Sequence, residues 1–189
     1  VLMWICLIPL LVAGTAINTL FIYNDVVLFV RPTVDPHNRW VHSSLPISIQ
    51  FADPWRIAPI GSLSDGSADA EFSGSLGESL VIFDQTLSDG FDTSIDWRRQ
   101  SIMEVVSDAD CSETRCLIEG SLVRVAQLYC EGTVVGYPDL NVSVHFENSE
   151  HHIELYFHAS PDRRNRQKYI DRFDRVFSGF RFEEEKGSS

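Results

Sequence analysis

The histidines have the most evident capacity for chemistry in this sequence, because four of the six lie between residues 141 and 160. Imidazole binds transition metals and titrates near neutral pH, and neighbouring carboxylates can complete a metal site. Four side chains could converge: His145, Glu147, His152 and Glu154. Imidazoles and carboxylates also pair across the strands of a hairpin on its wet face. We interpret the set first as a solvated polar face, and second as a weak metal-binding or pH-sensitive patch.

A β-hairpin must position these groups. Residues 141–147 and 152–158 both alternate apolar with polar side chains, which is the period of a half-buried strand. A slip by one residue would place apolar side chains opposite polar ones throughout, so the parity of the register is well defined. One antiparallel register matches every apolar pair: Val142 with Phe157, Val144 with Leu155, and Phe146 with Ile153.

This register decides which polar side chains can meet. Across the strands it pairs His145 with Glu154, and Glu147 with His152. His158 falls opposite Asn141, which is roughly 13 Å along the ladder from His145 and too far away to share one metal ion. We therefore expect at most the first four side chains to form a single site.

The basic run at residues 162–168 is a second candidate site. Arg163, Arg164 and Arg166 occupy the first half of a predicted helix in an otherwise acidic chain. A cluster of this kind could bind an acidic protein partner or a phosphate group, whereas most charge runs on helices are simply solvated. We favour the solvated face and keep the docking patch as the alternative.

Three of the four cysteines lie in the predicted domain, and Cys6 lies in the apolar segment at the start of the chain. An odd number leaves one thiol unpaired. Cys111 and Cys116 close a short segment, which makes them the first choice for a disulfide, with Cys130 as a buried free thiol. Pairing of Cys130 with either of the other two stays open.

Several classes of function lack support in the sequence. We find no nucleophile elbow, no phosphate-binding loop of the Walker type and no dinucleotide-binding motif, and we expect no cofactor. The formal net charge of −12 should repel nucleic acid and anionic membrane surfaces.

Residues 1–23 contain no charged side chain and are long enough to cross a bilayer. We interpret them first as an uncleaved membrane anchor. A signal peptide cleaved after Ala16 is the second interpretation, because small residues precede that bond, and a buried core helix is the third. The first two place the rest of the chain outside the cytoplasm, where a disulfide can persist.

The remaining chain divides into a connector at residues 24–44, a domain at 45–183 and a solvated tail at 184–189. We expect strands at 47–51, 71–73, 79–85 and 121–132, in addition to the hairpin, with an edge strand at 180–182. A capping box at residues 93–96 predicts a helix that ends near Ser107. Ser160 as N-cap and Pro161 at the first helical position predict a second helix, which Gly179 ends.

The order of these elements resembles that of the PsbP-like domain. The residues that carry the resemblance are "ISIQFADPW", "ESLVIFD", "SLVRVAQLYCEG", the hairpin and the closing "YIDRFDRVFSGFRF". The resemblance implies an α+β fold in which helices pack on both faces of an antiparallel sheet. It also implies a non-catalytic binding role, as in lumenal photosystem II proteins, envelope lipoproteins and chaperones of secreted effectors.

We therefore expect a membrane-tethered, extracytoplasmic accessory domain that acts through contacts with another envelope or membrane protein and is not an enzyme. The alternative is an envelope hydrolase, or a protein that binds a small ligand or metal, whose site is formed by residues distant in the sequence. A deep pocket lined by titratable groups would favour that alternative.

Overall fold

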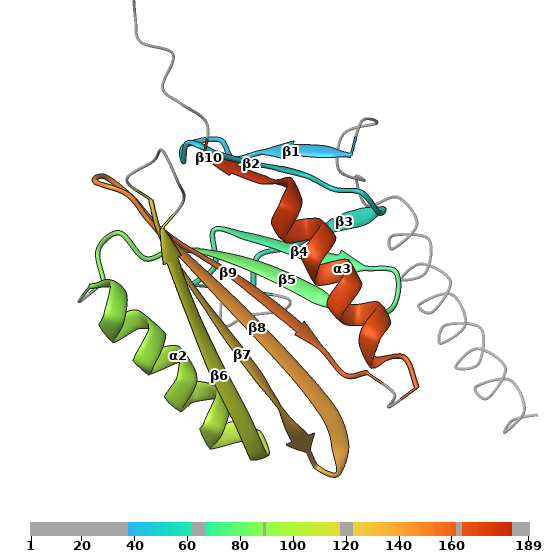
Figure 1. Ribbon diagram of the computed structural model, residues 1–189. Coiled ribbons are helices and arrows are strands. Elements are labelled where there is room, and N and C mark those ends of the chain that lie inside the picture. Colours follow the sequence, from blue (N-terminus) through green and yellow to red (C-terminus); the bar gives the residue numbers. More distant parts are fainter. Residues whose placement is uncertain (1–37, 62–66, 89, 118–122, 162–163, 183–189) are drawn as a thin grey trace, which may run out of the picture. The chain divides into compact units, whose positions relative to one another are not determined.

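The computed structural model describes residues 38–61, 67–88, 90–117, 123–161 and 164–182, which belong to one compact unit, Thr33–Ser189. A seven-stranded antiparallel sheet has the order β3-β4-β5-β9-β8-β7-β6, and a smaller sheet has the order β1-β2-β10 (Figure 1). The elements are β1 (Arg39–Val41), β2 (Ile47–Gln50), β3 (Trp55–Ala58), β4 (Ala70–Gly74), β5 (Ser79–Asp84), α2 (Phe91–Val105), β6 (Ser107–Leu117), β7 (Arg124–Val134), β8 (Tyr137–Glu147), β9 (His152–Ala159), α3 (Arg166–Gly179) and β10 (Phe180–Phe182).

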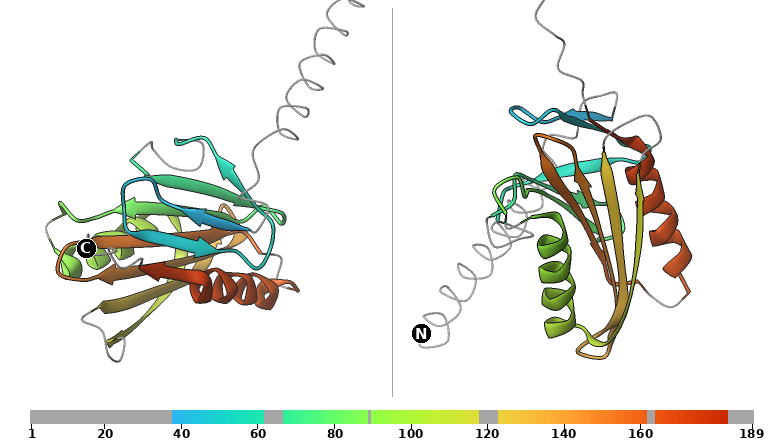
Figure 2. Two further views of the ribbon diagram at one scale, coloured as in Figure 1. Left: turned by 90° about the horizontal axis from the view of Figure 1, so that it is seen from above. Right: turned by 60° about the vertical axis from the view of Figure 1, so that its left-hand side comes forward.

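Helices α2 and α3 lie on opposite sides of the large sheet (Figure 2). The apolar face, which includes Val144, Leu155 and Phe157, packs against α3 and the small sheet in the main hydrophobic core. The other face packs against α2 through two smaller apolar clusters. This arrangement confirms the expected α+β fold with a mostly antiparallel sheet.

The predicted hairpin register is confirmed. Strands β8 and β9 pair Val142 with Phe157, Val144 with Leu155, and Phe146 with Ile153. All six of these side chains are buried, so the apolar alternation alone was sufficient to fix the parity.

Helix α3 ends at Gly179 and β10 follows at once, as predicted. A Cβ atom at Gly179 would lie 2.0 Å from the carbonyl oxygen of Gln50, so the close approach of the helix end to β2 requires glycine. The helix begins later than expected. It starts at Arg166 after Asn165, so Pro161 does not occupy its first position.

Helix α2 begins at Phe91, before the predicted capping box, with Gly90 at the N-cap and no side-chain cap. Strand β6 then follows almost directly, although we expected no strand there. Its sequence lacks apolar alternation because it is an edge strand with mostly exposed side chains. Strand β1 lies in the segment that we predicted to be a connector, and it pairs with β2.

The predicted Cys111–Cys116 disulfide is wrong. Both residues lie on β6, where five residues separate them by roughly 16 Å and place them on opposite faces. Cys111 instead lies directly opposite Cys130 on β7, and these two form the disulfide. Of the three cysteines that the structure describes, Cys116 is free and exposed.

The predicted anchor or signal segment at residues 1–23 and the tail at 184–189 lie outside the described residues. Among the residues that the structure does describe, no helix has the length and apolar character needed to cross a membrane.

Candidate functional site

A row of polar side chains from β8 and β9 lies beneath α2, and the interpretation as a solvated face is wrong for it. His145 has no exposed surface, Glu154 is 1% exposed and His152 is 4% exposed. Helix α2 covers this face of the sheet with Phe91, Ile95 and Ile102, among others. The row is a buried polar network, and each of its members needs a partner to offset its desolvation.

Arg98 and Glu154 form the centre of this network. The Arg98 Nε donates to Glu154 Oε1 at 2.5 Å, and Nη2 donates to Oε2 at 2.9 Å. Ser143 Oγ donates to the same carboxylate at 2.7 Å. Burial raises the pKa of Glu154, but the charge and hydrogen bonds of Arg98 outweigh this, so the pKa lies below its ordinary value. Glu154 is therefore a buried anion held by arginine.

The sequence contains a signal for the role of Arg98. Phe91, Ile95 and Ile102 are buried on α2, and Arg98 falls at helical spacing within this apolar stripe. An arginine on the buried face of a helix needs an anionic partner inside the fold. Glu147 and Glu154, on the polar face of the hairpin, were the two candidates, and the structure pairs Arg98 with Glu154.

His145 and His152 lie side by side under the start of α2. His145 Nδ1 is 3.2 Å from His152 Nε2, and His145 Nε2 is 2.9 Å from Ser143 Oγ. The ring of Phe91 contacts both imidazoles. Burial, opposed by the negative charge of Glu154, lowers the pKa of His145 to about 4, and burial also lowers the pKa of His152. Both rings are therefore neutral at pH 7.

The structure does not gather the four predicted metal ligands around one point. Glu154 is bound by Arg98, and Glu147 accepts a hydrogen bond from Arg124 at 2.8 Å. Within the described part of the chain, no group of three or more histidine, cysteine, aspartate or glutamate side chains could hold a metal ion.

Acid is expected to destabilise the protein through His145. Its pKa is about 4 when folded and about 6.5 when unfolded, so the unfolded state binds the proton first as the pH falls. Stability is complete above pH 6.5 and is lost toward pH 4. This group alone should lower the free energy of unfolding by about 2 kcal/mol between pH 7.5 and pH 5. Urea unfolding at the two pH values measures the loss.

The control for this prediction is His145→Gln, which cannot titrate. Its stability should fall less steeply over the same interval. Carboxylates whose pKa is lowered in the fold, such as Glu154, lose their stabilising effect only as the pH falls through the unfolded value of about 4.3. His152, whose pKa burial also lowers, contributes to the smaller loss that remains in the variant. An equally steep loss in the variant would show that His145 is not the responsible group.

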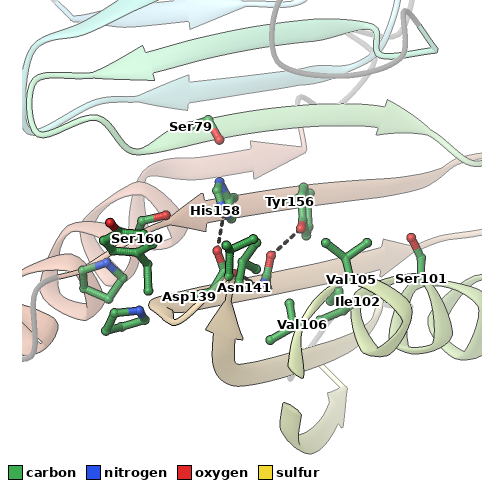
Figure 3. A pocket seen from close by; sticks show the side chains of 15 residues that line it. Ser79, Ser101, Ile102, Val105, Val106, Asp139, Asn141, Tyr156, His158 and Ser160 are labelled. Carbon is green, nitrogen blue, oxygen red and sulfur yellow. Dashed lines mark hydrogen bonds and ion pairs between the residues drawn. The ribbon is translucent and has the colours of Figure 1, made fainter. Parts of the chain in front are cut away.

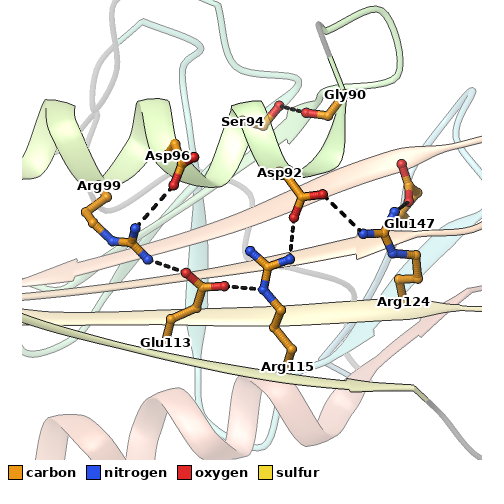
Figure 4. Close-up of polar contacts among 9 residues, drawn as sticks. All are labelled: Gly90, Asp92, Ser94, Asp96, Arg99, Glu113, Arg115, Arg124 and Glu147. Atoms are coloured by element: carbon orange, nitrogen blue, oxygen red, sulfur yellow. Dashed lines mark hydrogen bonds and ion pairs between the residues drawn. The ribbon is translucent and has the colours of Figure 1, made fainter.

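A series of ion pairs links the exposed side of α2 to the sheet (Figure 4). It joins residues of α2 to residues of β6, β7 and β8 in an alternating series. The members, in order, are Asp96, Arg99, Glu113, Arg115, Asp92, Arg124 and Glu147. Single exposed pairs contribute little, but a network with shared partners orients the helix over the polar row.

A groove of about 830 Å³ opens beside the C-terminal half of α2 (Figure 3). A hydrogen-bonded series forms its floor: Tyr156 donates to Asn141, Asn141 donates to Asp139, and His158 Nε2 lies 2.8 Å from Asp139 Oδ2. Burial raises the pKa of Tyr156 to about 12, so its hydroxyl keeps its proton. The floor is thus a fixed set of polar groups continuous with the buried row.

The rim of this groove is apolar and exposed. Val105 is 66% exposed, Val135 is 90% exposed and Tyr137 is 72% exposed, and all three line the groove. Exposed apolar side chains gathered around a concave surface are typical of binding sites. The sequence showed no motif for this site, because its members come from four separate segments of the chain.

Val135 is also held in a strained conformation. It has φ 52° and is followed by Gly136 at φ 82°, so the two form the tight turn between β7 and β8. Asparagine and glycine are favoured in such turns, whereas a β-branched residue at positive φ costs on the order of 1–3 kcal/mol. Neither burial nor turn geometry explains a valine at this position.

The predicted basic docking patch lies only partly within the residues that the structure describes. Arg163 lies outside the described residues. Arg166 pairs with Glu131 and also donates to the Tyr129 hydroxyl, so its charge is already neutralised within the domain. Binding of an acidic partner by Arg163, Arg164 and Arg166 stays a prediction.

No family model and no curated protein sequence matches the chain. The solution structure of cyanobacterial PsbP (CyanoP) from Synechocystis sp. PCC 6803 superimposes with a TM-score of 0.54, covering 76% of this chain and 91% of that one at 16% identity. The chain has a PsbP-like fold. This finding confirms the resemblance predicted from the order of elements. LpqN, involved in cell envelope biogenesis of Mycobacterium tuberculosis, matches this chain with a TM-score of 0.49 at 12% identity, covering 75% of this chain and 88% of that one.

Proposed function

We propose that the chain is an extracytoplasmic accessory domain, tethered to the membrane, that holds an apolar segment of an envelope protein in the groove beside α2. The main observation behind this proposal is the strained, exposed conformation of Val135. This residue is strained and almost fully exposed, so it lowers stability and adds nothing to the core. Backbone strain at an exposed residue is more common at binding and active sites than elsewhere, so this conformation supports a role in binding.

The groove supports this function by its chemistry. Val105 and Tyr137 extend the apolar rim, and Asn141 and Tyr156 on the floor keep hydrogen-bonding capacity toward the groove. A protein segment that presents an apolar side chain and its backbone amide would satisfy both. The net charge of −12 favours a neutral or basic partner.

The Cys111–Cys130 disulfide supports the proposed extracytoplasmic location, because disulfides persist outside the reducing cytoplasm. Residues 1–23 would supply the tether.

A photo-crosslinker placed at Tyr137 in the full-length chain, in its host cells, tests the proposed function. Leu117 is the matched control, since it is also 72% exposed but does not line the groove. We expect one discrete envelope protein to crosslink at position 137 and not at position 117. Equal products at both positions, or none at 137, would contradict the proposal.

Val135→Asn sharpens this test because it separates binding from folding. Asparagine tolerates positive φ, so the variant should be more stable by about 1 kcal/mol, while loss of the apolar rim should reduce crosslinking by about tenfold. A stabilised variant that crosslinks normally would exclude a role for the rim.

One observation favours hydrolysis as a second candidate function. Ser79 on β5 lies directly opposite His158 on β9, and His158 Nε2 is 2.8 Å from Asp139. Serine, histidine and aspartate in this order resemble a nucleophile, its base and an orienting acid. We rank it second because paired strands often bring such residues together. Covalent labelling of Ser79 by a fluorophosphonate probe would make hydrolysis the favoured function.

A further inference from the structure

A second hollow, of about 440 Å³, lies between the end of β5 and the N-terminal half of α2. None of its lining residues belongs to the groove described above. Its volume is within the range of about 300–1,000 Å³ that is usual for small-molecule sites. Two aromatic rings, Phe83 and Trp97, form part of its wall, and the Trp97 side chain is 57% exposed.

The two rings are held in place from within the fold. The guanidinium carbon of Arg98 lies 4.9 Å from the ring centroid of Phe83 and 5.0 Å from that of Trp97. Arg98 is itself fixed by the buried carboxylate of Glu154. The aromatic wall is therefore preorganised, which reduces the entropy lost when a ligand binds.

Apart from Leu87, the rest of the hollow is lined by residues with hydroxyl, amide or carboxylate side chains. Ser88 and Ser94 share a hydrogen bond of 2.8 Å, and Thr93 is exposed beside them. The Gln85 side chain donates to Glu154 at 3.2 Å, which fixes its amide, and Asp84 accepts a bond from the Thr86 amide. These groups offer both donors and acceptors at the edge of an aromatic surface.

We propose that this hollow binds a neutral saccharide. A sugar ring has an apolar face of C–H groups that packs on an aromatic ring, and hydroxyl groups at its edge that need donors and acceptors. The hollow has an aromatic wall for the apolar face of a sugar and polar groups beside it for the hydroxyl groups. An anionic ligand such as a nucleotide fits poorly, because Asp84 is the charged residue among those that line the hollow and the chain carries −12 overall.

Calorimetric titration of the full-length chain tests the inference, in a detergent without a sugar headgroup. The probes are chitotetraose, mannotetraose, maltotetraose and cellotetraose. We expect saturable binding of at least one of them. Trp97→Ala should weaken it at least about tenfold, and Trp97→Phe, which keeps an aromatic ring, should weaken it less.

The variants need a control for helix and fold. Met103→Ala is matched to Trp97→Ala, because Met103 is also on α2, is 56% exposed and lies outside the hollow. It should leave binding unchanged. Thr93→Val removes one hydroxyl without changing the aromatic wall, so it should weaken binding even if Trp97→Ala perturbs the helix.

Intrinsic fluorescence gives an independent readout. Among the described tryptophans, Trp55 is 1% exposed and Trp40 is only partly exposed, so Trp97 is the most accessible of the three to acrylamide. The difference in quenching between the unchanged chain and Trp97→Phe isolates its signal from that of the other tryptophans, Trp4 included. The bound saccharide should protect Trp97. Absence of saturable heat with all four probes up to millimolar concentration, or binding that survives Trp97→Ala, overturns the proposal.

The outcome is separable from that of the proposed function. Val135→Asn changes the rim of the groove and leaves the hollow intact, so it should not alter saccharide binding. Absence of a crosslink at Tyr137 in the chain that keeps Val135, together with saturable saccharide binding, would contradict the proposed protein-binding function alone.

Discussion

Replacement of Arg98 by alanine should lower the free energy of unfolding by about 3–5 kcal/mol. The variant leaves the Glu154 carboxylate buried without its cation, and breaking one partner of a buried pair typically costs this much. Ser143 and Gln85 still donate to the carboxylate, but neither supplies charge. Urea denaturation of wild type and variant at pH 7.5 measures the loss.

The double variant Arg98→Met with Glu154→Leu distinguishes an unpaired charge from a simple packing defect. It removes both charges and keeps much of the volume, and such replacements of buried ion pairs are often close to neutral. We expect it to be clearly more stable than Arg98→Ala. If the double variant lost as much or more, the ion pair itself would be a net source of stability.

Arg98→Ala should also loosen the attachment of α2 to the sheet. Arg98 joins the helix to β9 from beneath and contacts the rings of Phe83, Trp97 and Tyr156. Amide hydrogen exchange in residues 91–105 should therefore accelerate more than exchange in α3. The groove and the hollow both use α2 as a wall, so binding at either site should weaken in this variant.

Replacement of Phe173 by alanine should also cost about 3–5 kcal/mol, for a different reason. Phe173 is 3% exposed on α3, and its ring packs edge-on against Phe157 of the sheet with 5.6 Å between the centroids. The change removes a large apolar side chain and leaves a cavity in the main core. Thermal or urea unfolding at neutral pH gives the magnitude.

Phe177→Ala is the matched control on the same helix. Phe177 stacks on Phe146 and Phe173, but it is 37% exposed, so less surface returns to water and the gap can fill with solvent. We expect a loss of about 1–2 kcal/mol. Equal losses in the two variants would mean that α3 does not bury Phe173 as the structure places it.

Much of the fold could be predicted because its elements have strong internal periods. The hairpin of β8 and β9 alternates over its whole length, so only one parity of register places Val142, Val144 and Phe146 on the same face as the apolar residues of β9. Helix α3 repeats its apolar residues at helical spacing and ends at a glycine. These are local patterns, and neighbouring residues along the chain are sufficient to produce them.

Strand β6 and the disulfide could not be predicted in this way. The side chains of β6 are mostly polar because an edge strand buries little, and its hydrogen bonds to β7 depend on a partner that is distant in the sequence. Cys111 therefore seemed close to Cys116 along the chain. In the sheet it faces Cys130, which lies 19 residues away.

The candidate sites, like the fold, were predictable from the sequence only in part. Alternation in the sequence correctly placed His145 and Glu154 on one face of the hairpin. It could not show whether water or α2 covers that face, because a two-residue period specifies which side chains share a side and nothing about what packs there. Packing of α2 turned a polar face into a buried network with an arginine at its centre. The groove and the hollow arise from the same packing, since each lies where an end of this helix meets strands from elsewhere in the chain.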